Sequence, residues 1–191
     1  MLSETIRAAA RGELPPWAVA SPKRREHIAR VAALMEEWAG AAGLPPEERD
    51  RWVAAAWLHD ALRDADPEQL RAELPEELRD FPGPLLHGPA AAERLKGEAD
   101  EELRNAVRYH TLGHPSLGRL GKALYLADFL EPGRDFEVEW RAALRARMPE
   151  ALDEVAVEVV AARIRYLLEG RKPVRPETAA YWTALVGRDR R

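Results

Sequence analysis

The sequence predicts an all-α protein, and three observations favour this fold class. The chain has 191 residues, of which 46% are hydrophobic and 32% are charged, a composition typical of a globular protein. Ala, Leu, Glu and Arg are abundant, whereas β-branched and aromatic residues are few, and this balance favours helices. No segment alternates between apolar and polar residues as a half-buried strand would. We therefore expect one all-α domain, a single helical bundle.

The first half of the chain contains clear signals for where helices begin and end. Residues 2–11 predict a short amphipathic helix. Ser21-Pro22 predicts the start of a long helix, because a serine cap followed by proline at the first helical position is a favoured beginning, and Gly43 predicts its end. Pro45-Pro46 predicts a second long helix that runs to His59-Asp60.

The second half is punctuated by proline and glycine. Several prolines in residues 64–86 predict only short helices there. Longer helices are predicted over residues 89–96, 100–109, 117–130, 149–169 and 176–187. We divide the chain into an N-terminal helix and connection (1–20), the main domain (21–187) and a C-terminal tail (188–191).

Charge and cysteine content limit the classes of partner and chemistry. The net charge is −4, so no global basic field predicts binding to nucleic acid. The absence of cysteine excludes disulfides, thiolate metal ligands and cysteine nucleophiles, and fits a cytoplasmic protein. The N-terminal segment lacks the apolar run of a signal peptide, and we expect no membrane association. Six tryptophans leave room for an apolar homodimer interface.

Two apolar helix faces end abruptly in acidic residues. The run from Ala54 to Leu58 leads directly into His59-Asp60, and the run from Ala123 to Ala127 leads into Asp128. A buried carboxylate is costly unless a cation, a cluster of donors or a metal compensates it.

Each of these residues alone also has an ordinary structural explanation. A His-Asp pair can cap a helix, and Asp128 can pair with Arg134 or Lys122. The combination is stronger: four of the five histidines and both aspartates lie at helix ends or beside apolar faces. They occur in the order His27, His59-Asp60, His87, His110, Asp128, and histidine with carboxylate is typical of a divalent-metal site.

This order of residues resembles the HD-domain metal-dependent phosphohydrolases, in which a histidine, a His-Asp doublet and a late aspartate recur. Further motifs resemble the bacterial YqeK family within that class. They are His110-Thr111-Leu112-Gly113, the segment from Lys122 to Asp128, Glu131-Pro132-Gly133-Arg134 and Pro176 to Tyr181, together with Glu26-His27 and Leu86-His87-Gly88. The resemblance extends from about Pro22 to Leu185.

The resemblance implies an HD-domain helical fold and symmetrical hydrolysis of diadenosine tetraphosphate to two ADP. It also implies a divalent metal pair, iron in the first place, with Mn, Co, Zn or Mg as alternatives. Carried over residue by residue, His27, His59, Asp60 and Asp128 would hold one metal, and His87 and His110 the second, with Asp60 bridging.

Charged and polar residues near these motifs are expected to contact the nucleotide. The predicted catalytic residues are Asp60 and Arg63, and the predicted substrate-binding residues are Arg24, Arg63, Thr111, Gly113, His114, Lys122 and Arg134. Arg63 departs from the family, which usually has lysine there, and a planar guanidinium binds phosphate differently from a compact ammonium. Ile28 and Trp182 also depart from the family pattern, but neither position is a predicted ligand.

Two other hypotheses remain open on the sequence. The chain could be an HD-type hydrolase of another nucleotide, such as a monophosphate, a triphosphate or a cyclic species. It could also be a helical nucleotide-binding protein that keeps the ligands without catalysis.

Overall fold

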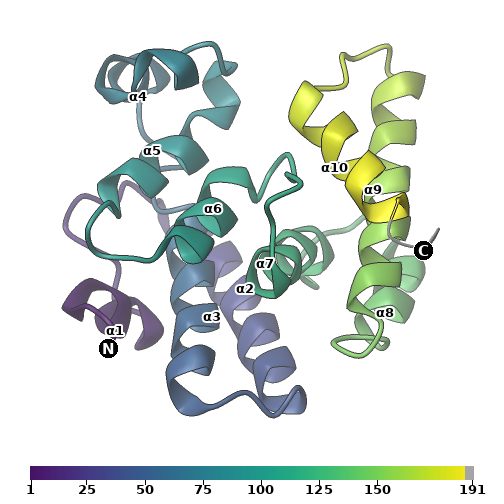
Figure 1. Ribbon diagram of the computed structural model, residues 1–191, viewed down its shortest axis with the longest axis horizontal. Coiled ribbons are helices and arrows are strands. Elements are labelled where there is room, and N and C mark those ends of the chain that lie inside the picture. The colour runs from purple at the N-terminus through teal and green to yellow at the C-terminus, as the bar shows by residue number, and fades with distance from the viewer. Residues whose placement is uncertain (188–191) are drawn as a thin grey trace.

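The computed structural model describes residues 1–187, and these residues form an all-α protein, as the sequence predicts (Figure 1). The predicted tail, residues 188–191, lies outside the described residues. The α-helices are α1 (Glu4–Ala10), α2 (Pro22–Ala41), α3 (Pro46–His59), α4 (Pro67–Glu73), α5 (His87–Arg94), α6 (Glu101–Tyr109), α7 (Arg119–Leu130), α8 (Val138–Arg145), α9 (Leu152–Glu169) and α10 (Pro176–Val186). Two 3₁₀ turns, Glu76–Leu78 and Gly83–Leu85, separate α4 from α5.

Two long segments of the prediction, at α2 and α6, begin at a side chain that caps the helix. The Ser21 hydroxyl accepts a hydrogen bond from the backbone N–H of Arg24 at 3.3 Å, and Pro22 is the first residue of α2. Asp100 caps α6 in the same way, accepting from the N–H of Leu103 at 3.0 Å. These caps satisfy backbone donors that a helix start leaves unpaired, which is why the short sequence signals were sufficient.

The starts of several helices, and one whole helix, differ from the prediction; α7, for example, begins at Arg119 instead of Leu117. Helix α5 begins at His87, two residues before the predicted Pro89. Helix α9 begins at Leu152 instead of Pro149, because residues 146–151 form turns between α8 and α9. Helix α8 was not predicted at all. It has eight residues and buries only Arg141 and Leu144, so its apolar pattern is too short to be recognised.

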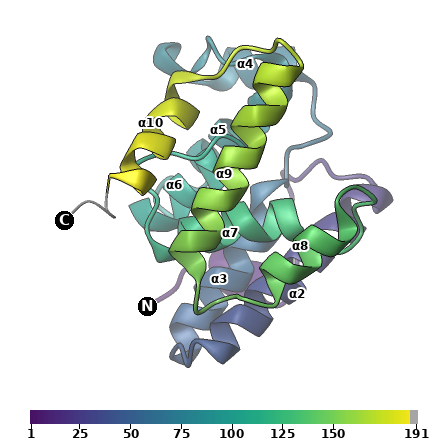
Figure 2. The same ribbon diagram turned by 90° about the vertical axis from the view of Figure 1, so that its right-hand side faces the viewer.

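Helix α7 is the centre of the molecule. It contacts α2, α3, α6, α8 and α9, and nine of its twelve residues are buried. Helices α2 and α3 form a hairpin beside it, and α1 packs against α3 (Figure 1). On the opposite side, α9 and α10 form a second pair, with α8 leading into α9 (Figure 2).

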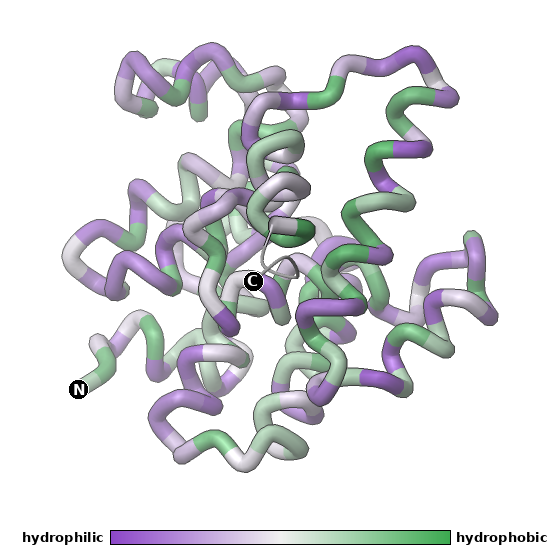
Figure 3. The backbone as a smooth tube through the Cα atoms, turned by 45° about the vertical axis from the view of Figure 1, so that its right-hand side comes forward, coloured by the Kyte–Doolittle hydropathy of each residue, from purple (hydrophilic) through white to green (hydrophobic). Residues whose placement is uncertain are grey.

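The hydropathy pattern agrees with a core shared by amphipathic helices. The backbone changes repeatedly between hydrophobic and hydrophilic residues along most helices (Figure 3). Trp38 and Trp52 lie in the core with 1% exposure each, and the other four tryptophans are half-buried, so the homodimer suggested by their number stays a prediction. Within residues 1–187, no helix is both long enough and apolar enough to span a membrane.

Candidate metal centre

Five helices bring the six predicted metal ligands together. His27 comes from α2, His59 and Asp60 from the end of α3, His87 from the start of α5, His110 from the end of α6 and Asp128 from α7. The four histidines and Asp60 are each at most 7% exposed. Residues separated by about a hundred positions in sequence therefore share one buried pocket of donor atoms.

Asp60 lies in the middle of this cluster, and its two carboxylate oxygens face different histidine pairs. Oδ1 is 3.1 Å from Nε2 of His87 and 3.4 Å from Nε2 of His110. Oδ2 is 3.7 Å from Nε2 of His27 and 3.6 Å from Nε2 of His59. A carboxylate placed in this way can be a ligand to two cations at once, one through each oxygen.

The donor atoms are close enough to hold a metal ion. The ligand atoms of His27, His59 and Asp128 lie within 4.8 Å of one another, and so do those of His59, Asp60 and His110. Oδ1 of Asp128 is 3.1 Å from Nε2 of His27. Imidazole nitrogens and carboxylate oxygens in one buried cluster are the ligands preferred by divalent transition metals.

Every histidine in the cluster uses Nδ1 for a hydrogen bond directed away from the centre. In three of them the acceptor is the backbone carbonyl three residues earlier: Ala56 for His59 (2.6 Å), Pro84 for His87 (3.1 Å) and Val107 for His110 (2.7 Å). The fourth acceptor is a carboxylate, because Nδ1 of His27 donates to Oε1 of Glu131 at 3.2 Å. Since these oxygens only accept, the proton is on Nδ1 and the Nε2 lone pair points to the centre, as metal ligation requires.

The environment of the Nε2 atoms suits a cation. Those of His27 and His59 are buried and make no hydrogen bond within residues 1–187. The Nε2 atoms of His87 and His110 are 3.1 Å apart. Because both rings have the proton on Nδ1, the lone pairs of the two Nε2 atoms face each other. Such a pair is repulsive unless a proton or metal ion lies beside it, so the residues present fit a divalent-metal site.

Burial and neighbouring charge set the protonation states of the cluster. Burial lowers the pKa of His59 to about 4 and also lowers that of His87, so both rings are neutral at neutral pH. Although burial opposes ionisation, the surrounding histidines hold the pKa values of Asp60 and Asp128 below their usual range. His110 is the exception: burial would lower its pKa, but Asp60 raises it. The cluster thus combines ionised carboxylates with mostly neutral imidazoles.

Four of the predicted substrate-binding residues lie at this centre. Arg24 donates to Oδ2 of Asp60 at 2.7 Å, and Arg134 donates to Oδ1 of Asp128 at 2.9 Å. The Thr111 hydroxyl is 3.0 Å from Nε2 of His110. The backbone N–H of Arg63 donates to the carbonyl of Asp60 at 3.0 Å, so Arg63 lies directly beside this predicted ligand.

The other three predicted substrate-binding residues have structural contacts away from the ligands. Gly113 has a φ of +73°, and an added Cβ would lie 2.1 Å from the ring of Tyr181. The ring of His114 stacks on Tyr109 at 4.2 Å. The Lys122 ammonium is buried and pairs with Asp153. Their role in substrate binding stays a prediction, and these contacts give each residue a packing or pairing reason to be present.

Glu131 contacts a predicted metal ligand but was not among the predicted site residues. Its carboxylate is 2% exposed and is held by Arg30 at 2.6 Å and by the N–H of Gly133 at 2.7 Å, while it accepts from His27. The available signal was its position directly after the apolar Phe129-Leu130, the same pattern that marked Asp128.

Arg141 and Gly88 support the centre from outside and were also not selected. Arg141 is 1% exposed and donates to the carbonyls of Phe129, Glu131, Arg134 and Phe136. It thus fixes the segment after Asp128. Gly88 permits α5 to approach α6, because an added Cβ would lie 2.9 Å from the carbonyl oxygen of Arg108.

Comparison with known proteins assigns the class. The HD domain family model matches residues 24–133, a segment that contains all six predicted metal ligands. A crystal structure of a predicted HD superfamily hydrolase involved in NAD metabolism, from Clostridium acetobutylicum, superimposes with a TM-score of 0.75 at 26% identity. The superposition covers 88% of this chain and 91% of that one.

Two relatives define the group more narrowly. A symmetrical bis(5'-nucleosyl)-tetraphosphatase from Halalkalibacterium halodurans is 28% identical over 174 residues, 86% of this chain and 92% of that protein. The protein of the same name from Bacillus subtilis is 30% identical over 141 residues, 69% of this chain and 74% of that protein. The chain therefore belongs to the HD domain family and, within it, to the YqeK-like group of symmetrical bis(5'-nucleosyl)-tetraphosphatases.

Proposed function

We propose that this chain hydrolyses diadenosine tetraphosphate symmetrically to two ADP at a dinuclear centre. The observation that carries the proposal is the position of Asp60, whose two oxygens face separate histidine pairs. His27, His59 and Asp128 would complete one metal site, and His87 and His110 the other. The names of the relatives support the substrate, and the buried donor cluster supports the metal pair.

The surrounding residues are suited to an anionic substrate. Divalent cations bound here would polarise phosphate oxygens and stabilise the charge that develops on them. Arg24 and Arg134 add positive charge on two sides of the cluster, next to Asp60 and Asp128. The leaving group, ADP, is already a stable anion, so the main requirement is neutralisation of charge, which these guanidinium groups and Arg63 supply.

The donor set narrows the choice of metal. Imidazole and carboxylate without thiolate suit iron, manganese, cobalt and zinc, whereas magnesium prefers oxygen ligands. We propose iron as the resident metal. A cytoplasmic location is part of the same proposal, because the substrate is a nucleotide and the chain has no cysteine.

Product analysis on the metal-loaded protein tests the proposal. We expect ADP as the sole nucleotide product from diadenosine tetraphosphate, and loss of both activity and bound metal in Asp60→Asn. Asp50→Asn is the matched control, because Asp50 is an exposed carboxylate on the same helix. Formation of AMP and ATP would exclude symmetrical cleavage, and an Asp60→Asn protein that keeps its metal and activity would refute the site.

A substrate panel separates the alternative functions. It should contain a nucleoside monophosphate, a triphosphate, a cyclic nucleotide and NAD, the last because the structural relative is described as involved in NAD metabolism. A higher kcat/KM for any of these than for diadenosine tetraphosphate would favour a different nucleotide hydrolase. Nucleotide binding without hydrolysis, with each of the four metals, would favour the non-catalytic hypothesis.

A further inference from the structure

A large cleft lies beside the metal centre, between the end of α7, the segment leading into α8, and α9. Its volume is about 1050 Å³, and its walls include Phe129, Phe136, Trp140, Tyr166, Arg134 and Arg163. We call it the aromatic cleft. Figure 2 shows the helices that border it, α8 and α9, which diverge from their connection at residues 146–151.

Aromatic side chains of the cleft remain partly exposed to solvent, although Lys172 lies 4.6 Å from the ring centroid of Tyr166. The ring of Phe129 packs edge-on against Phe136 and Trp140, with centroid distances of 5.9 and 6.1 Å. Phe136 remains 44% exposed, and Tyr166 on the facing helix remains 63% exposed. Clustered, exposed aromatic side chains lining a concave surface are typical of a site that binds a flat ligand.

Two arginines connect this cleft to the metal centre. Arg134 lines the cleft and donates to Oδ1 of Asp128 at 2.9 Å. Arg163 also lines it and donates to the carbonyl of Thr111 at 2.8 Å, next to the ligand His110. Phe129 directly follows Asp128 in α7, so the cleft begins one residue from a predicted ligand, and both arginines that line the cleft also contact residues of the centre or next to it.

The charges of the cleft suit a neutral group inside it and phosphates at its inner edge. Its walls contain three arginines and three glutamates, so its interior has no net charge.

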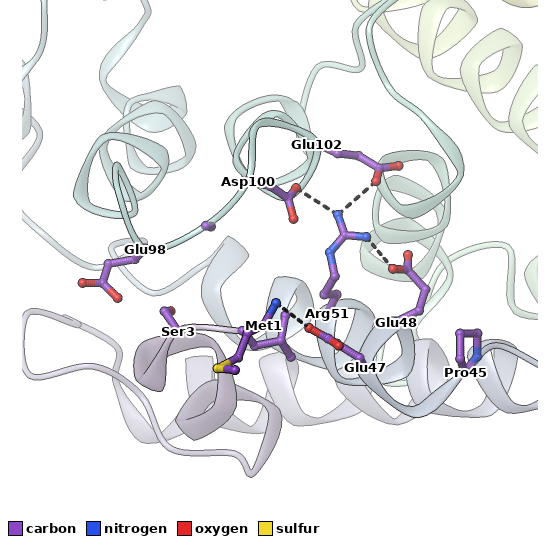
Figure 4. Close-up of a pocket in the computed structure, with 11 residues that line it drawn as sticks. Met1, Ser3, Pro45, Glu47, Glu48, Arg51, Glu98, Asp100 and Glu102 are labelled. Atoms are coloured by element: carbon purple, nitrogen blue, oxygen red, sulfur yellow. Dashed lines mark hydrogen bonds and ion pairs between the residues drawn. The ribbon is translucent and has the colours of Figure 1, made fainter.

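A second pocket, at the N-terminal ends of α3 and α6, differs from the aromatic cleft in its charge (Figure 4). There Glu48, Asp100 and Glu102 surround and neutralise Arg51, Glu47 pairs with the N-terminal ammonium of Met1, and Glu98 adds further negative charge. That acidic pocket would repel a polyphosphate.

We propose that the aromatic cleft binds one nucleoside end of the substrate. The purine base stacks against the aromatic side chains, and the phosphate chain passes Arg134 and Arg163 to reach the metal centre. The cleft has ample room, since pockets for small ligands usually measure about 300–1000 Å³. This proposal rests on the proposed function, because it takes a purine nucleotide as the substrate.

Binding of ADP to the metal-loaded protein tests the cleft without using catalysis. We would measure ADP and inorganic pyrophosphate by calorimetry for wild type, Tyr166→Ala and Trp140→Ala. Because stacking of the base on an aromatic ring contributes to binding, each variant should bind ADP roughly tenfold more weakly. Pyrophosphate affinity should not change. Leu168→Ala is the matched control, because Leu168 is 63% exposed on the same helix but is not part of the cleft wall.

The outcomes separate this proposal from the proposed function. Tyr166 is exposed, so its substitution leaves the core intact even if Trp140→Ala fails to fold. Unchanged ADP affinity in Tyr166→Ala, or no ADP binding by wild type, would overturn the cleft proposal. So would a change from dimer to monomer in Tyr166→Ala with ADP affinity preserved, because the aromatic surface would then be an interface between copies. Failure of wild type to release ADP from diadenosine tetraphosphate would instead refute the proposed function.

Discussion

Glu131 accepts a hydrogen bond from Nδ1 of His27, and this contact fixes the orientation of a ligand that has no carbonyl acceptor of its own. His27 lies inside α2, where backbone carbonyls already accept hydrogen bonds from the following turn. His59, His87 and His110 lie at helix ends and use the carbonyl three residues earlier. Glu131 therefore orients the ring of His27, as backbone carbonyls orient the rings of the other three histidines.

Substitution of Glu131 should weaken metal binding. Glu131→Gln keeps the size of the side chain but replaces the anionic acceptor, and loss of such a partner typically costs about 10–100-fold in metal affinity. The measurement is a competition titration against a chelator of known affinity. Glu26→Gln is the control, because Glu26 is exposed and adjacent to His27 in sequence. An affinity within twofold of wild type would contradict the role of Glu131.

Gly88→Ala should disturb the His87–His110 pair. The new Cβ would lie 2.9 and 3.0 Å from the carbonyl oxygens of Arg108 and Val107, so α5 must move away from α6. We expect the metal content to fall from two ions per chain to one. Gly40→Ala is the control, because its Cβ would meet only Arg49 at 3.6 Å. Two tightly bound ions in Gly88→Ala would show that the close helix contact is not required.

Arg141→Met should destabilise the segment that follows Asp128. The substitution leaves the buried carbonyls of Phe129 and Glu131 without their donor. Unsatisfied buried groups of this kind cost about 1–3 kcal/mol each, so the free energy of unfolding should fall by roughly 3 kcal/mol or more. Urea denaturation measures it. Arg147→Met removes only an exposed ion pair with Glu158 and should cost less than about 1 kcal/mol. Equal losses in the two variants would be inconsistent with this role of Arg141.

The metal-free protein should lose stability in mild acid because of His59. Its pKa is lowered from the ordinary value of 6.5 to about 4 by burial. Between these pH values the unfolded chain binds a proton that the folded chain does not, so the free energy of unfolding falls as the pH decreases. The contribution of His59 should reach about 3 kcal/mol at the acidic end. Urea denaturation at several pH values should show a shallower decline in metal-free His59→Gln than in wild type. Identical slopes would contradict the burial of a neutral ring.

The sequence predicts the metal ligands better than it predicts the hydrogen-bond acceptors that orient the histidine ligands. His59-Asp60 and Asp128 interrupt apolar runs, and that pattern is visible without a structure. The acceptors of His59, His87 and His110 are backbone carbonyls, which no residue type marks. They could not be predicted because they depend on the course of the chain at each helix end.

Some helices are likewise signalled by local sequence, whereas others depend on tertiary contacts. Caps such as Ser21 and Asp100 determine a helix start locally, so α2 and α6 begin where predicted. Helix α8 is held by Arg141, whose acceptors come from the loop between α7 and α8 and the end of α7. A helix whose main buried residue is an arginine has no apolar stripe to reveal it, and only the tertiary contacts explain it.

Anomalous diffraction from crystals of the iron-loaded protein shows whether the centre holds two metal ions. We predict two metal peaks, one bonded to Nε2 of His27 and His59 and the other to Nε2 of His87 and His110. Both peaks should contact Asp60, one through each carboxylate oxygen. A single peak would contradict the dinuclear centre, and the absence of any peak among these side chains would contradict the assignment of the site.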